Sequence, residues 1–190
     1  MMPTRILTTL LLALSAHFLS AADPQLSKPP QPTAEHKFLN QFAGEWECAN
    51  EVTFEGGEPV TSKGTMSGRM IGNFWVVLNV TAEDGTKEGY LGHGTLGFDS
   101  QNTKNCYGTW VDSMSPFLWK YEGKVDGNKL ILDSEAPDPT DSKKMIRTRD
   151  TWEFKKDGTL VLTSRMEDAD GKLWALMKSS CRRKAASKKK

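Results

Sequence analysis

The chain has 190 residues, of which 25 are Lys or Arg, 24 are Asp or Glu and three are Cys. This length is typical of one domain that can form its own core, and the odd, small number of cysteines argues against a disulfide-dependent scaffold. No Cys-x-x-Cys, metal-ligand spacing or phosphate-binding glycine loop occurs, so no metal and no cofactor are predicted.

Residues 1–22 have the pattern of a signal peptide. Arg5 precedes an apolar run, Ile6 to Leu19, and Ser20-Ala21-Ala22 supplies small residues for cleavage before Asp23. The alternative is a membrane anchor, but the run is shorter than the roughly 20 residues that a span requires. We therefore predict an exported protein, periplasmic or extracellular, with no transmembrane segment after cleavage.

The remaining charge is distributed unevenly. Six of the 25 basic residues lie in Arg182–Lys190 and Arg5 lies in the signal, so 18 basic residues stand against 24 acidic ones elsewhere. A net-acidic body argues against nucleic-acid binding. Residues 184–190 are predicted to be a disordered basic tail, with contact to an anionic surface as the alternative.

Residues 23–33 contain four prolines and are predicted to form an extended linker. Thr33 is a candidate cap for a short helix that continues to Phe42, with Phe38 and Leu39 on the same side as Phe42. Gly44 would end this helix. We interpret it as a lid or plug that packs on the strand-rich domain that follows.

Ten short strand-like segments follow, and several are separated by Asp-Gly pairs, which are strong hairpin signals. Their predicted bounds are Trp46–Phe54, Val60–Met70, Phe74–Thr81, Lys87–Phe98, Cys106–Met114, Phe117–Val125, Lys129–Ala136, Lys144–Phe154, Thr159–Glu167 and Lys172–Arg182. A meander of ten strands either exposes two edges or closes on itself. We predict an all-β domain over residues 34–183, a single up-and-down antiparallel barrel with a short N-terminal helix.

Most segments alternate between an apolar or aromatic face and a polar face. In the sixth, Trp119 and Tyr121 share one side while Lys120 and Glu122 share the other. The third segment, residues 74–78, is apolar on both faces. We expect the N-terminal helix to cover its outer side.

Three motifs together resemble a known family. They are Phe42-Ala43-Gly44-Glu45-Trp46, Gly94-Thr95-Leu96-Gly97-Phe98-Asp99 and Tyr107-Gly108-Thr109-Trp110-Val111-Asp112-Ser113-Met114. Their order, followed by Pro137-Asp138-Pro139, is similar to the bacterial domain-of-unknown-function family 1579 of the calycin, lipocalin-like superfamily. The resemblance implies a lipocalin-like barrel in which Trp46 closes one end and Arg182 or Arg183 stacks on it. It implies no activity.

A barrel of about ten strands is wide enough to enclose a cavity. Its predicted lining, taken from the apolar and aromatic faces, is Met66, Met70, Tyr90, Trp110, Asp112, Trp119, Tyr121, Asp150 and Trp152. Such a lining would admit a small apolar molecule, and binding of that kind is the leading prediction. The alternative is a structural or interaction module whose interior is filled.

Catalysis is the less favoured hypothesis. His93, Asp112 and Ser113 resemble parts of a nucleophilic triad, but adjacent strand residues point to opposite faces, and His93 is expected outside. No catalytic residue is therefore predicted. Cys48 and Cys181 fall at the paired ends of the first and last segments, and we consider two alternatives for them: a disulfide bond or two buried free thiols. Cys106 has no candidate partner in either case.

Overall fold

The structure is a computed structural model that describes residues 30–54, 57–83 and 85–185. The predicted signal peptide, the predicted linker up to residue 29 and residues 186–190 of the predicted basic tail lie outside the described residues. The chain divides into two compact units, residues 1–31 and 32–190, and the helix and strands described below belong to the second.

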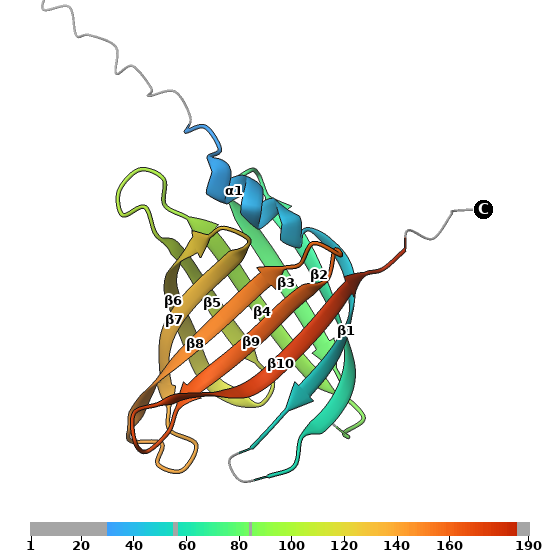
Figure 1. Cartoon of the computed structure of the whole chain (residues 1–190), viewed down its shortest axis with the longest axis vertical. Helices are drawn as coiled ribbons and strands as arrows, with labels where there is room; N and C mark the ends of the chain where they lie inside the picture. The colour runs from blue at the N-terminus through green and yellow to red at the C-terminus, as the bar shows by residue number, and fades with distance from the viewer. Residues whose placement is uncertain (1–29, 55–56, 84, 186–190) are drawn as a thin grey trace, which may run out of the picture. The chain divides into compact units, whose positions relative to one another are not determined.

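The fold is a closed antiparallel barrel of ten strands with one short helix, as the sequence predicts (Figure 1). Helix α1 (Ala34–Leu39) runs into a 3₁₀ turn, η1 (Asn40–Phe42). The strands are β1 (Gly44–Val52), β2 (Val60–Ile71), β3 (Trp75–Ala82), β4 (Tyr90–Phe98), β5 (Cys106–Asp112), β6 (Ser115–Asp126), β7 (Lys129–Pro137), β8 (Met145–Phe154), β9 (Leu160–Glu167) and β10 (Leu173–Arg183).

Each strand pairs with the next in sequence, and β1 also pairs with β10, so no strand edge is left open. Antiparallel closure explains the alternation in the sequence, because one side of every strand faces the interior. Three hairpins turn at Asp-Gly pairs where Gly127, Gly158 and Gly171 have positive φ. Glycine adopts this conformation without steric cost, which is why these pairs mark the strand ends.

The seam between β1 and β10 is held by a stacked cation. The guanidinium carbon of Arg183 lies 4.3 Å from the ring centroid of Trp46. The same guanidinium donates hydrogen bonds of 2.6 Å to the carbonyls of Gln41 and Ala43. Arg182 instead points to solvent, with its guanidinium 3.8 Å from Asp157. Arg183 therefore joins the last strand to the chain that enters the first.

Gly44 is required by this arrangement for two reasons. Its φ is +120°, and an added Cβ would lie 2.6 Å from Nη1 of Arg183. Two residues later, the indole of Trp46 is 1% exposed and donates a 3.0 Å hydrogen bond to the Phe42 carbonyl. The Gly-x-Trp motif thus serves both the turn out of η1 and the stack on Arg183.

A disulfide crosses the same seam. Cys48 and Cys181 are direct partners in the β1–β10 register and are bonded, so the bond links positions 133 residues apart. Cys106 is free and buried on the inward face of β5. Of the two alternatives that the sequence left for Cys48 and Cys181, a disulfide or two free thiols, the structure has the disulfide.

Helix α1 packs over one end of the barrel (Figure 1). Phe38, Leu39 and Phe42 are buried there, and the Phe42 ring meets the rings of Trp152 and Phe154 edge-on at 5.4 and 5.0 Å. The interpretation as a plug is therefore confirmed. The expected cover over the outer side of β3 is wrong: Trp75 stays 43% exposed, because the apolar side chains of α1 are directed into the barrel end.

His36 fixes α1 to the barrel rim. Its Nδ1 accepts a 2.9 Å hydrogen bond from the Thr33 amide, which leaves Nε2 to donate to the Phe98 carbonyl at 3.0 Å. His36 is 2% exposed and also contacts the rings of Phe74 and Phe98. His36 is thus part of the plug.

We expect Trp46→Ala to lower the free energy of unfolding by about 3–5 kcal/mol, the usual range for deleting a buried aromatic side chain. Trp75→Ala is the matched control, because Trp75 lies on the outer wall of the same barrel; we expect it to cost about 1–2 kcal/mol. Urea denaturation followed by circular dichroism measures both. Equal losses in the two variants would contradict the placement of Trp46 at the seam.

Candidate functional site

The barrel interior has two halves with different packing. In the half next to α1, most inward side chains are buried and form the core with the helix, and Met70, Phe98, Val125 and Phe154 pack against them while partly buried. The buried ones include Trp46, Met66, Val76, Leu78, Leu96, Cys106, Leu130, Leu132, Trp152 and Leu160. Burial raises the pKa of the Cys106 thiol to about 11, so this thiol stays protonated at neutral pH. This half is a filled core.

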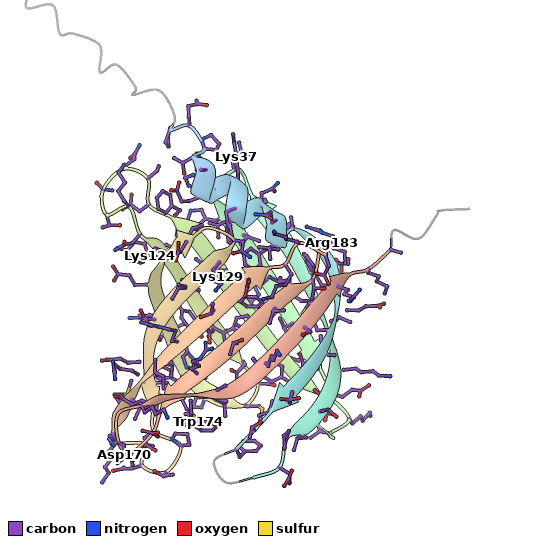
Figure 2. All side chains as sticks on the ribbon, in the orientation of Figure 1. Lys37, Lys124, Lys129, Asp170, Trp174 and Arg183 are labelled. Atoms are coloured by element: carbon purple, nitrogen blue, oxygen red, sulfur yellow. A yellow bond between two sulfur atoms is a disulfide. The ribbon has the colours of Figure 1, made fainter. Side chains whose placement is uncertain are left out.

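In the other half, the aromatic and several polar inward side chains keep accessible surface inside the closed wall, while Ser134, Ala136, Ile146, Met166 and Ser179 are buried. We call this region the open half of the lumen and define it by Tyr90, Trp110, Asp112, Phe117, Trp119, Tyr121, Thr148, Asp150, Ser164, Trp174 and Met177. Figure 2 labels Trp174 at this end of the barrel and Arg183 at the opposite end. Residual accessible surface inside a closed wall indicates room for a small molecule.

Trp110 lies flat against the wall because two glycines make room for it. A Cβ at Gly92 or Gly94 would lie 2.2 or 2.5 Å from the indole ring. The indole Nε1 donates a 3.1 Å hydrogen bond to the hydroxyl of Tyr90. Trp119 is the direct partner of Trp110 in the β5–β6 register, so two indoles and a phenol share this part of the lumen.

The Tyr90 hydroxyl is also hydrogen-bonded to Asp112, so a series of hydrogen bonds runs from the Trp110 indole through Tyr90 to Asp112. Burial and the neighbouring Asp112 carboxylate raise the pKa of Tyr90 well above its usual value, so it remains a donor. Asp112 also accepts hydrogen bonds from the amides of Met114 and Ser115, at 2.9 and 3.1 Å. A bulge between Trp110 and Asp112 in the β5–β6 pairing places this carboxylate at the end of the strand.

Asp150 is the second carboxylate of the open half. Burial raises its pKa, and hydrogen bonds from Ser164 and Tyr121 offset part of that rise. Burial, with Asp150 as its hydrogen-bond partner, also raises the pKa of the Tyr121 hydroxyl. Buried groups with perturbed pKa values are concentrated at sites where proteins bind or transform ligands, which makes Asp150 and Tyr121 candidate site residues.

The structure brings together six of the nine residues that the sequence predicted for the lining: Tyr90, Trp110, Asp112, Trp119, Tyr121 and Asp150. The other three belong to the packed half. Met66 and Trp152 are buried in the core; Met70 is partly buried against it, as Trp110 and Tyr121 also are, but lies at the α1 end of β2. They face inward as predicted, but α1 fills the space that they would otherwise line.

Several polar residues of the interior were missed by sequence reasoning. Ser179 donates a 2.7 Å hydrogen bond to Asn50, and the Asn50 amide reaches Ser62 at 3.4 Å. The hydroxyl of Thr148 is buried without a hydrogen-bond partner among the described residues. The sequence does carry a signal for Ser164: it is two residues from both Leu162 and Met166 along the strand and therefore shares their inward face.

The triad considered from the sequence is not assembled. His93 is exposed on the outer face, with Nδ1 2.8 Å from the side-chain oxygen of Asn79. Ser113 lies in the β5–β6 turn, where its hydroxyl accepts a hydrogen bond from the Leu91 amide. Among the described residues, no cluster of three or more His, Cys, Asp or Glu could hold a metal ion, and no helix is long and apolar enough to cross a membrane.

Two hollows on the barrel, of about 910 and 490 Å³, lie along β1, β2 and the β3–β4 loop. Their linings mix lysine and glutamate side chains, such as Lys63 and Glu83, and contain no aromatic ring. Neither hollow contains a buried charged group. The open half of the lumen is therefore the stronger candidate site.

Comparison with known proteins agrees with this architecture. A family model described as "Protein of unknown function (DUF1579)" matches residues 31–183. The chain belongs to this family. Two solved structures share the fold: Rv2717c from M. tuberculosis (12% identity, TM-score 0.59, 82% of this chain and 100% of that one) and the S-type phycobiliprotein lyase CPES from Guillardia theta (11%, 0.54, 82% and 95%). No curated protein matches.

We expect Asp150→Asn to stabilise the protein at alkaline and neutral pH. The native pKa of this carboxyl is raised, so the folded state holds a proton that the unfolded state releases, and stability falls as pH rises from about 4 toward the native pKa. Asparagine does not ionise, so the variant does not lose stability as the pH rises, and its side-chain oxygen can still accept hydrogen bonds from Tyr121 and Ser164.

The measurement is the free energy of unfolding of both proteins from pH 4 to pH 8. The gain should be largest at pH 8 and should shrink toward pH 4. Asp170→Asn, in an exposed turn, is the control and should show no such trend. A pH-independent difference for Asp150→Asn would show that the Asp150 carboxyl has an ordinary pKa.

Proposed function

We propose that this protein binds a small molecule with an apolar, ring-containing body in the open half of the lumen. The observation that supports the proposal is the group of partly accessible aromatic side chains inside a closed wall, with two carboxyls at fixed positions among them. Apolar pockets with a few oriented polar groups are the usual form of small-molecule sites.

The alternative is a structural module with a filled interior. It explains the half next to α1, where most inward side chains are buried. It does not explain Asp150, whose desolvation in the interior costs stability that no internal cation offsets. Natural proteins retain such local conflicts mainly where function requires them.

The proposal is binding, and no reaction is part of it. One barrel of this fold is a phycobiliprotein lyase, so the fold is compatible with catalysis in another protein. In this chain, however, Ser113 and His93 are both outside the lumen, so the triad considered from the sequence is not formed there. The pair of Tyr121 and Asp150 can hold and orient a ligand.

We also propose that the protein is exported and works in an oxidising compartment. The apolar run of residues 6–19 and the small residues before Asp23 support export. The disulfide between Cys48 and Cys181 supports an oxidising environment, because such bonds persist mainly outside the reducing cytosol.

Binding is tested with a neutral naphthalene probe, 1-naphthylmethanol, followed by quenching of tryptophan fluorescence. We expect saturable binding to the wild-type protein and a loss of affinity of roughly tenfold in Trp119→Ala. Trp75→Ala is the control, because Trp75 is on the outer wall and should leave the affinity unchanged. Native mass spectrometry of protein from its own host would then report any co-purified ligand.

Two outcomes would contradict the proposal. One is the absence of saturable binding to the wild-type protein together with no co-purified molecule. The other is an equal effect of the two tryptophan variants, which would place the probe on the outer surface.

Export is tested by expressing the full chain in a Gram-negative host and recovering the periplasmic fraction. We expect an N-terminus at Asp23 and, by non-reducing peptide mapping, a linkage of Cys48 to Cys181 with Cys106 unmodified. An uncleaved protein in the cytosol with three free thiols would refute this assignment.

A further inference from the structure

We infer that the ligand of the open half carries a positively charged nitrogen, such as a protonated amine, beside its ring system, and that this nitrogen lies between the aromatic rings and the two carboxyls. The inference rests on the proposed function and names the class of molecule bound. It depends on three features of the lumen: its charge, its rings and its free acceptors.

The charge of the lumen is one-sided. The only inward-facing acids of the ten strands are Asp112 and Asp150, and no inward-facing position of these strands carries Lys, Arg or His. The Lys and Arg side chains that pair with acids do so on the outside, as Arg149 does with Asp133 at 2.6 Å. An anionic ligand would therefore meet two acids and no cation, whereas a cation would supply the missing opposite charge.

The rings form the walls around these acids. Tyr90, Trp110, Trp119 and Tyr121 project inward from three neighbouring strands, β4, β5 and β6. The electron-rich faces of indole and phenol attract cations, and the attraction is stronger where both groups are desolvated. Aromatic side chains combined with carboxylates therefore favour an organic ammonium group over a neutral group of the same shape.

Acceptor capacity also remains for N–H donors. The donors recorded for Asp150 are Ser164 and Tyr121, which leaves lone pairs free on its carboxylate. An ammonium group provides up to three donors and can use the acceptor positions that remain on Asp150.

Binding of a cation should also lower the pKa of Asp150 and release any proton that this carboxyl holds at the working pH. Burial raises the pKa of Asp150, and the groups that face it are neutral Tyr121 from β6 and Ser164 from β9, with Tyr90 and Asp112 farther along the lumen. A neighbouring ammonium favours the ionised carboxylate and lowers that pKa. Proton release on binding is thus a signature that a neutral ligand would not give.

The experiment uses three probes with one ring system: 1-naphthylmethylammonium, the neutral 1-naphthylmethanol and the anionic 1-naphthoate. Titration calorimetry of the full mature chain at pH 7 in two buffers of different ionisation enthalpy measures the affinity and the protons released. We expect the ammonium to bind at least roughly tenfold more tightly than the alcohol, and the alcohol more tightly than the carboxylate.

Two variants locate the effect. Asp150→Asn should reduce the preference for the ammonium over the alcohol at least roughly fivefold and abolish proton release. Asp133→Asn removes a carboxylate from the outer face of the adjacent strand β7 and should change neither quantity. The comparison separates lumen charge from the general field of an acidic protein.

Equal affinity for the ammonium and the alcohol would overturn the inference and leave the proposed binding site intact. A preference for the ammonium that Asp133→Asn reduces as much as Asp150→Asn would also overturn it, because the attraction would then be a surface effect. Failure of all three probes to bind would count against the proposed function itself.

Discussion

The structure depends on the pairing of its first and last strands. Nine of the ten strand pairs join neighbours in sequence, and hairpin turns form them locally; β1 with β10 is the pair that must be closed over the length of the domain. Closing so long a loop is entropically costly. The same seam carries the Cys48–Cys181 bond and the Arg183–Trp46 stack, so covalent and non-covalent links both act at the point of greatest cost.

The seam also determines where the lumen is filled. Arg183 bonds the carbonyls of Gln41 and Ala43, which fixes the exit of η1 and places Phe42 inside the barrel end. His36 fixes the other end of α1 to the carbonyl of Phe98. With the helix held at both ends, its apolar side chains complete the core of one half, and the opposite half has no such plug among the described residues.

That asymmetry gives the interior a gradient from apolar core to polar, ring-lined space. At the α1 end, carboxyl groups would have no solvation, and none face inward there. At the other end, Asp112 and Asp150 face inward among tyrosines and tryptophans, and the desolvation of Asp150 costs stability. Such a cost is tolerated most readily where binding recovers it, which links the stability of the empty barrel to the chemistry of its ligand.

The sequence alone was enough for the strand number, the meander and the closed barrel, because period-two alternation and Asp-Gly turns are local signals. It also indicated the inward phase of Trp110, Asp112 and Asp150, since phase follows from counting along one strand. The bulge beside Asp112, the exact strand ends and the buried position of His36 were beyond it. The bulge depends on how β5 and β6 pair, and the burial of His36 depends on Phe98, 62 residues away in the chain.

Tertiary structure alone decided which inward residues line free space. Trp152 and Trp119 have the same local pattern, yet Trp152 meets Phe42 from the plug while Trp119 keeps accessible surface. It also decided that Arg183 rather than Arg182 covers Trp46, and that Cys48 meets Cys181. The physical reason is that alternation assigns a side chain to a face, whereas depth along the barrel axis is set by register and by what packs into the end.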